Sequence, residues 1–194
     1  MAAVVLAAGG STRMGDRHKL TALLGDRPLV AYAVDTVLAS RARPVVVVTG
    51  HRAEAVRASL GGREVTFVAN PEWPTGLASS LRAGLAVVPE AVAGVLVCLG
   101  DMPRIRAATL DALLDAFTGP TAIVVPEYQG RRGHPVLFGR DHFVELARTT
   151  GDVGARGLLE RHAQNVVPVD DPGVLVDVDT PADLSALSAT GRRP

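Results

Sequence analysis

A glycine-rich segment near the amino end, LAAGGSTRMGDRHK at residues 6–19, combines the groups that bind phosphate. Gly9 and Gly10 let the backbone approach a ligand closely and present its N–H donors. Arg13 and Lys19 add two cations, which can neutralise a triphosphate that main-chain dipoles alone would hold weakly. We therefore predict that this segment binds the phosphates of a nucleoside triphosphate.

The spacing of this segment differs from two common phosphate-binding motifs. Gly10 and Gly15 are spaced like the two glycines of a P-loop, but Asp16 stands where the P-loop has its lysine. Ser11 and Thr12 follow the paired glycines, so the segment does not have the dinucleotide-binding pattern G-x-G-x-x-G. A plain strand-to-helix turn is the alternative to a phosphate site, and the two cations of the segment argue against it.

A second candidate group is Asp101, in LGDMP at residues 99–103. It follows an apolar run that predicts a buried strand, and a carboxylate at the carboxyl end of such a strand can hold Mg²⁺ against NTP phosphates. Taken alone, an aspartate after a strand is more often a helix cap or a turn residue. The phosphate-binding segment after the first strand shifts the interpretation toward a metal ligand.

Two serines offer hydroxyls to the same nucleotide. Ser79 and Ser80, in GLASSLRAG at residues 76–84, come near the start of a predicted helix, where they can bond a ribose, base or phosphate. Capping of the helix by Ser79 is equally consistent with the spacing.

Polar side chains in the second half of the chain are candidates for binding another ligand. Arg131, Arg132 and His134 lie between glycines in GRRGHPVLF, a concentration of donors suited to an anionic or heteroaromatic molecule. Asp152 and Arg156, in TGDVGAR, are candidates to act with them. A charged surface loop is the alternative for the first group, and an internal salt bridge or a cap for the second.

Alternating strands and helices are expected to position these groups. Five short apolar runs predict buried strands of a mostly parallel sheet, at residues 4–7, 45–49, 65–69, 95–99 and 122–126. Four segments between them have helical spacing, at residues 28–38, 53–60, 77–87 and 107–117. This order predicts a doubly wound α/β fold, in which ligands bind at the carboxyl ends of the strands.

The regular alternation ends near residue 126. Glycines and prolines beyond it predict an insertion over one edge of the sheet, which would shape the acceptor pocket. A return strand near residues 174–178 and a helix at residues 181–187 are expected to close a single domain at residues 1–189. Residues 190–194 are expected to form a disordered tail.

Composition narrows the classes of function. Lys plus Arg equals Asp plus Glu at 20 each, so no general attraction to nucleic acid or to a membrane is expected. Cys98 lies in an apolar run and favours a reducing, cytoplasmic compartment. No segment is long enough to span a membrane. The histidines other than His134 show no metal-ligand spacing such as H-E-x-x-H, and we interpret them as surface or structural.

Taken together, the motifs resemble those of the MobA-like NTP transferases, specifically the molybdenum cofactor cytidylyltransferase group. The resemblance begins with LAAG, RMG and the lysine of residues 6–19 and covers nearly the whole chain. It continues through NPEW at 70–73, GLASSLRAG at 76–84, LGDMP at 99–103, GRRGHPVLF at 130–138, TGDVGAR at 150–156 and DVDTPAD at 177–183. It implies a Rossmann-like α/β domain with an acceptor-side insertion, Mg²⁺ as the cofactor, and transfer of CMP or GMP to the phosphate of a molybdopterin.

The same resemblance implies a role for each matching residue. The catalytic residues are Arg13, Lys19 and Asp101. The nucleotide-binding residues are Leu6, Ala7, Ala8, Gly9, Gly10, Arg13, Lys19, Asn70, Ser79, Ser80 and Asp101. The acceptor-binding residues are Arg131, Arg132, Gly133, His134, Asp152 and Arg156. Asp101 and Asp177 are the metal ligands, and Asp179, expected on the same face of a strand as Asp177, is the alternative second ligand.

The implied reaction is attack of the acceptor phosphate on the α-phosphorus of CTP. Such a phosphate is largely ionised near pH 7 and needs no general base, so alignment and charge neutralisation carry the catalysis. Lys19 is expected to stabilise the transferring group, and Arg13 to hold the β- and γ-phosphates. Ala8 stands where the guanine-using enzymes have glycine, and its methyl group favours the smaller base of CTP.

Alternatives remain for both the substrates and the kind of function. The donor could be GTP, or the acceptor a sugar phosphate or another small phosphorylated metabolite. A more distant alternative is a non-catalytic module that delivers cofactor to a molybdoenzyme or works with its chaperone. Arg13, Lys19 and Asp101 together argue against that module, because delivery alone needs neither a triphosphate clamp nor a metal ligand.

Overall fold

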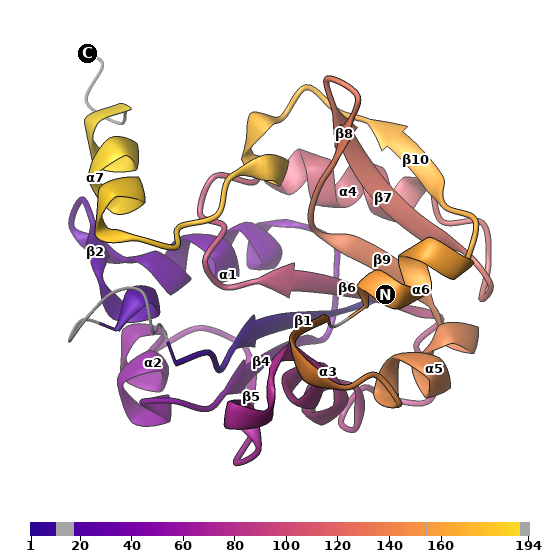
Figure 1. Cartoon of the computed structure of the whole chain (residues 1–194), viewed down its shortest axis with the longest axis horizontal. Coiled ribbons are helices and arrows are strands. Elements are labelled where there is room, and N and C mark those ends of the chain that lie inside the picture. Colours follow the sequence, from indigo (N-terminus) through magenta and orange to yellow (C-terminus); the bar gives the residue numbers. More distant parts are fainter. Residues whose placement is uncertain (11–17, 154, 191–194) are drawn as a thin grey trace.

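The computed structural model describes residues 1–10, 18–153 and 155–190. A mixed sheet with helices on both sides forms its centre, with the strands in the order β10-β7-β9-β6-β1-β4-β5 and β8 paired to β7 (Figure 1). The strands of this sheet are β1 (Ala2–Ala7), β4 (Val45–Thr49), β5 (Thr66–Ala69), β6 (Gly94–Leu99), β7 (Ile123–Tyr128), β8 (Arg131–Arg132), β9 (Val136–Gly139) and β10 (Asn165–Pro168). The α-helices are α1 (Leu29–Ala39), α2 (Ala53–Ser59), α3 (Leu77–Leu85), α4 (Ala107–Asp115), α5 (Phe143–Ala147), α6 (Arg156–Arg161) and α7 (Pro181–Thr190). The predicted α/β class and the strands and helices predicted before residue 126 are confirmed.

The parallel part of the sheet is covered on both faces. β1 pairs in parallel with β4 on one side and with β6 on the other, and all of its residues are buried. Side chains of α1, α2 and α4 pack on the face that includes Val5, while α3, α5 and α6 pack on the face that includes Val4. Burial on both faces explains why these strands are continuously apolar instead of alternating. Cys98 belongs to this core, where burial raises the pKa of its thiol to about 12.

One strand lies inside the sheet where the sequence predicts an insertion over its edge. β9 runs antiparallel between β6 and β7, with Leu137 opposite Leu96 on one side and Val124 on the other. Every residue of β9 is buried. The predicted edge position is therefore wrong for this segment. The surrounding glycines and prolines mark the turns into and out of a central strand instead of an insertion over the edge.

Gly139 ends β9 at a point where the chain leaves no room for a side chain. A Cβ atom there would clash with the carbonyl oxygen of Pro120. Gly139→Ala is expected to lower the free energy of unfolding by about 1–3 kcal/mol, because the backbone must move to relieve the overlap. Urea denaturation followed by circular dichroism measures the change. Gly61→Ala is the matched control, since the atom nearest its added Cβ is 3.5 Å away, and equal losses in the two variants would refute the steric explanation.

The carboxyl end closes the fold without the predicted return strand. A 3₁₀ helix, η6 (Pro172–Leu175), occupies this region, and the side chain of Asp171 accepts a hydrogen bond from the N–H of Gly173 at 3.0 Å. Helix α7 then packs Leu184 and Leu187 near the short hairpin of β2 (Leu23–Leu24) and β3 (Arg27–Pro28). Thr190, the first residue of the expected tail, ends α7, and residues 191–194 lie outside the described residues. None of the helices described is long and apolar enough to cross a membrane.

Candidate active site

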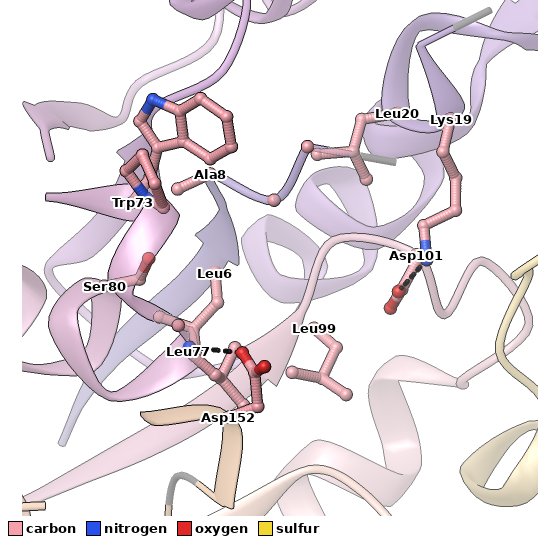
Figure 2. A pocket seen from close by; sticks show the side chains of 14 residues that line it. Leu6, Ala8, Lys19, Leu20, Trp73, Leu77, Ser80, Leu99, Asp101 and Asp152 are labelled. Carbon is pink, nitrogen blue, oxygen red and sulfur yellow. Dashed lines mark hydrogen bonds and ion pairs between the residues drawn. The ribbon is translucent and has the colours of Figure 1, made fainter. Parts of the chain in front are cut away.

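A cavity of about 340 Å³ opens at the carboxyl ends of β1 and β6, where a parallel sheet binds its ligands. Many of the predicted nucleotide-site residues line it (Figure 2). These are Leu6, Ala8, Gly9, Gly10, Lys19, Ser80 and Asp101. Asp152, which we assigned to the acceptor, lines the same cavity. Arg13 lies outside the described residues, so its predicted role stays a prediction.

Lys19 and Asp101 form an ion pair at one side of the cavity (Figure 2). Lys19 begins a short 3₁₀ helix, η2 (Lys19–Thr21), which the buried side chain of Leu20 anchors to the core. Its Nζ atom donates to Oδ2 of Asp101 at 2.7 Å and to Oδ1 of Asp179 at 2.8 Å. Burial opposes the charge of Lys19, but the two carboxylates outweigh it and raise the pKa of the ammonium above its ordinary value. Lys19 is therefore a fixed cation at neutral pH.

Within residues 1–10, 18–153 and 155–190, only one carboxylate oxygen of Asp101 has a hydrogen-bond partner. Its backbone follows β6 through Gly100, and its carbonyl accepts a hydrogen bond from the N–H of Val178 at 3.0 Å. While Oδ2 contacts Lys19, Oδ1 is buried and has no hydrogen bond within the described part of the chain. Burying a carboxylate oxygen without a hydrogen-bond partner is energetically unfavourable unless a ligand binds it. This oxygen fits a hard divalent cation, which prefers oxygen ligands.

The two aspartates of DVDTPAD differ in their surroundings. Asp179 contacts Lys19, whereas Asp177 is exposed. The negative charges of Asp177 and Asp101 both act to raise the pKa of His134. The strand on which we expected them to share a face is not formed. Both carboxylates therefore remain candidates for the second metal ligand, with Asp179 the one that meets Lys19 directly.

Asn70 and Ser79 lie next to the first cavity without lining it. Asn70 donates through Nδ2 to the hydroxyls of Ser79 at 2.9 Å and Ser80 at 3.0 Å, and all three residues are buried. Ser79 donates to backbone carbonyls of Glu72 and Gly76 and does not cap α3, whose N-cap is Gly76. Only Ser80 of the three lines the cavity. The geometry gives Asn70 and Ser79 a positioning role.

Trp73 is a cavity residue that our sequence reasoning did not single out. Its ring lines the cavity (Figure 2). The ring packs against Gly10, where an added Cβ would come within 2.8 Å of Trp73 Cζ3. It also contacts His51 at 5.0 Å between ring centroids, and His51 contacts His18 at 5.4 Å. Trp73 is the only tryptophan of a chain poor in aromatic residues. That rarity, next to Asn70 in NPEW, is the signal that could have identified it.

A second cavity of about 320 Å³ adjoins the first. Leu6, Leu77, Leu99 and Asp152 line both. The second cavity is mostly apolar, and its polar side chains are those of His134, Asp152 and Arg156. Asp152 accepts a hydrogen bond from the N–H of Leu77, the first residue of α3, at 3.3 Å. Three of the predicted acceptor residues therefore meet in one place.

His134 contributes a neutral ring to the second cavity. Burial lowers the pKa of its imidazole below the ordinary value, although Asp101 and Asp177 act in the opposite direction. Its Nδ1 atom is buried and has no hydrogen bond among the residues described. A neutral imidazole with an unused nitrogen suits a ligand that offers a matching donor or acceptor.

The two arginines of GRRGHP are separated from His134. Arg131 and Arg132 form β8, are exposed, and do not line either cavity. Arg132 donates to Oε1 of Gln164 at 2.8 Å. Gly133, between them and His134, packs against Val174 so closely that a Cβ would overlap it. The predicted cluster is thus divided, and only its histidine lines a cavity, the second one.

Comparison with known proteins agrees with this arrangement. A nicotine blue oxidoreductase from Paenarthrobacter nicotinovorans is 33% identical over 95% of this chain and 94% of its own length. The bifunctional protein GlmU of Geobacter metallireducens is 32% identical over 72% of this chain, which matches 29% of that longer protein. The structure of Rv0371C from Mycobacterium tuberculosis in complex with manganese superposes with a TM-score of 0.83 at 31% identity, covering 97% of this chain and 98% of that one. Residues 3–166 match the MobA-like NTP transferase domain. The chain therefore belongs to the MobA-like NTP transferase family and is a nucleotidyltransferase.

Proposed function

We propose that this nucleotidyltransferase transfers CMP from CTP to the phosphate of molybdenum-loaded molybdopterin and releases pyrophosphate. The observation that carries the proposal is the contact between two unlike cavities. One holds Lys19 and Asp101 and suits the phosphates of a nucleotide, while the other is apolar with a neutral His134 and suits a planar heteroaromatic acceptor. Leu6 and Asp152 belong to both, so the two substrates would meet at their common border.

The carboxylates near Lys19 fit a divalent cation, which we propose to be Mg²⁺. Asp101 would hold it through the buried Oδ1 atom, together with Asp177 or Asp179. When bound, the cation would offset negative charge on the phosphates. The manganese in the Rv0371C structure supports a divalent metal in a family member.

The residues of the chain would then act by charge and alignment. Lys19, held as a cation by two carboxylates, would stabilise the phosphoryl group as it is transferred. Arg13 would hold the β- and γ-phosphates. The acceptor phosphate is already ionised near neutral pH and needs no side chain to remove a proton.

The choice of CTP depends on the loop after β1. Ala8 is buried and lies so close to Gly50 that a Cβ on that glycine would be 2.8 Å from the Ala8 Cβ. Trp73 covers Gly10 beside it. This crowding favours the smaller pyrimidine ring.

Two other functions have specific support. The sugar phosphate acceptor that the sequence leaves open is the first, but the apolar lining of the second cavity offers few partners to sugar hydroxyls. The nearly full-length match to a nicotine blue oxidoreductase raises a redox reaction on a heteroaromatic substrate as the second candidate. Such a substrate would suit the same apolar cavity.

A direct assay separates these functions. The protein is incubated with Mg²⁺, each of the four NTPs in turn, and either molybdopterin or a sugar 1-phosphate. Pyrophosphate release with CTP and molybdopterin, and recovery of CMP from the product, are expected. Release only with the sugar phosphate, or reduction of a heteroaromatic compound by an added hydride donor without pyrophosphate release, would reject the proposal in favour of one of the alternatives.

Removal of the His134 ring is expected to weaken acceptor binding and to spare the nucleotide. In His134→Ala the Kd for the acceptor should rise about tenfold or more, because one desolvated hydrogen bond is lost, while the Kd for CTP changes by less than about threefold. Isothermal titration of each ligand measures both constants. Arg132→Ala is the comparison, since its side chain is outside both cavities. Loss of CTP binding in His134→Ala with acceptor binding retained would overturn the division of the two cavities.

A further inference from the structure

A second group of ligand atoms lies at the opposite end of the sheet from Asp101. β9 runs antiparallel to β6, so its last residue, Gly139, pairs with Gly94 at the amino end of β6. The chain then passes through a 3₁₀ helix, η4 (Arg140–His142), into α5. His142, Glu145 of α5 and His162 after α6 meet here, with one ligand atom of each within 4.8 Å of the others. His142 and Glu145 are close in sequence, but His162 follows Glu145 by 17 residues, so the three do not form a recognisable motif.

His142 has the tautomer that a metal ligand requires. Its Nε2 atom is 2.9 Å from the carbonyl oxygen of Thr121. Since a carbonyl only accepts hydrogen bonds, Nε2 carries the proton and Nδ1 keeps its lone pair. The ring is only 7% exposed, so this orientation is fixed by packing. A histidine that donates its other N–H to a backbone carbonyl is the usual arrangement around protein-bound zinc.

Glu145 and His162 provide the other two ligand atoms and face solvent in part. His162 Nε2 is 2.8 Å from Glu145 Oε2, and the rings of His142 and His162 are 4.9 Å apart between centroids. Arg161 also contacts Glu145, through the other oxygen, Oε1. The side chains of Glu145 and His162 are 36% and 37% exposed. Rotation toward a metal would exchange the contact between His162 and Glu145 for bonds to the ion, and the open side leaves space for water as a further ligand.

We propose that His142, Glu145 and His162 form a binding site for a zinc-like transition-metal ion, separate from the nucleotide site. Two imidazoles and one carboxylate favour Zn²⁺ or Co²⁺ over Mg²⁺, which prefers oxygen ligands. Zinc bonds of about 2.1 Å in tetrahedral geometry place ligand atoms roughly 3.4 Å apart, so the three atoms need only small side-chain rotations to close on one ion.

The site would join two helices that flank the substrate cavities. Glu145 is on α5 and His162 follows α6, while the chain between these helices carries Asp152, which lines both cavities. A metal bound by Glu145 and His162 would link the two helices that precede and follow this loop. The bound ion is therefore expected to stabilise the loop without contacting substrate.

Metal titration of untagged protein tests this site. The Asp101→Asn background removes a ligand of the proposed catalytic metal, so that any remaining saturable binding can be assigned elsewhere. Isothermal titration with Zn²⁺ should give one equivalent, Co²⁺ should give the visible absorption of a tetrahedral site, and Mg²⁺ should not compete. Bound Zn²⁺ should also raise the melting temperature.

Variants of the two partly exposed ligands decide the outcome. Glu145→Gln and His162→Gln should each weaken Zn²⁺ binding by at least about tenfold and remove the cobalt spectrum. Glu160→Gln is the matched control, because Glu160 is an exposed carboxylate on α6 that pairs with Arg156. Circular dichroism verifies that each variant is folded. Absence of saturable Zn²⁺ binding, or binding unchanged in the Glu145→Gln, His162→Gln double variant, would overturn the proposal.

Discussion

Asp101→Asn is expected to lower the rate of pyrophosphate release by about 10²–10³-fold, the size of loss seen when one preorganised electrostatic group is removed from an active site. The substitution keeps the shape of the side chain but removes its charge. It thereby weakens the ligand of the proposed Mg²⁺ and one of the two carboxylates that orient Lys19. Initial rates with saturating CTP, acceptor and Mg²⁺ measure the effect.

The control for this variant is another aspartate that pairs with a cation. Asp111→Asn removes a carboxylate of α4 that contacts Arg41 on the surface, and its rate should stay near that of the wild type. Excess EDTA should stop the wild-type reaction, and added Mg²⁺ should restore it. An Asp101→Asn variant with nearly full activity, or turnover that persists in EDTA, would show that Asp101 does not act through a metal.

The nucleotide side of the site is predictable from the sequence because its chemical groups directly follow predicted strands. The glycine turn and LGDMP each follow a continuously apolar run, and parallel strands bring their carboxyl ends to one edge. The contact between Lys19 and Asp101, 82 residues apart, follows from that topology. Local periodicity therefore suffices to predict a site when each of its chemical groups follows the end of a regular strand.

The acceptor side of the site is poorly predicted because tertiary contacts override the local sequence pattern of residues 130–138. β9 is only four residues long and lies between glycines, yet it fills the gap between β6 and β7. Its burial separates His134, which faces a cavity, from Arg131 and Arg132, which are exposed on β8. Adjacent residues of one motif thus have different environments, and spacing along the chain cannot distinguish them.

The role of Asp179 also depends on contacts beyond its own segment. We expected a strand there, but η6 is stabilised by the Asp171 side chain and no strand forms. Asp183 accepts hydrogen bonds from the N–H groups of Asp179 and Thr180, at 3.1 and 2.7 Å, just before α7 begins. This turn fixes the backbone of Asp179 while its side chain contacts Lys19. Such a turn is set by three residues together and leaves no periodic signal.

Lys19→Ala is expected to lower kcat by about 10²-fold while changing the KM for CTP by less than about threefold. The Nζ atom lies 2.7 Å and 2.8 Å from two carboxylates and its side chain is only 14% exposed, so the ammonium is held in place before substrate arrives. A charge fixed in advance opposes the negative charge that develops during transfer, and a loss confined to the transition state appears in kcat. By the rate equation, a 10²-fold loss corresponds to about 2.7 kcal/mol.

Removing this cation also leaves Asp101 and Asp179 facing each other without the ammonium between them. Their mutual repulsion should be relieved by a bound divalent cation, so Lys19→Ala is expected to melt at a lower temperature without metal and to regain part of the difference in Mg²⁺. Steady-state kinetics and thermal melts with and without Mg²⁺ measure the two effects. Arg41→Ala, which removes an exposed surface cation paired with Asp115, should change neither kcat nor the response to Mg²⁺. If Lys19→Ala raises the KM for CTP and leaves kcat unchanged, Lys19 binds the nucleotide equally in the ground and transition states, and its assignment to the transferring phosphoryl group is wrong.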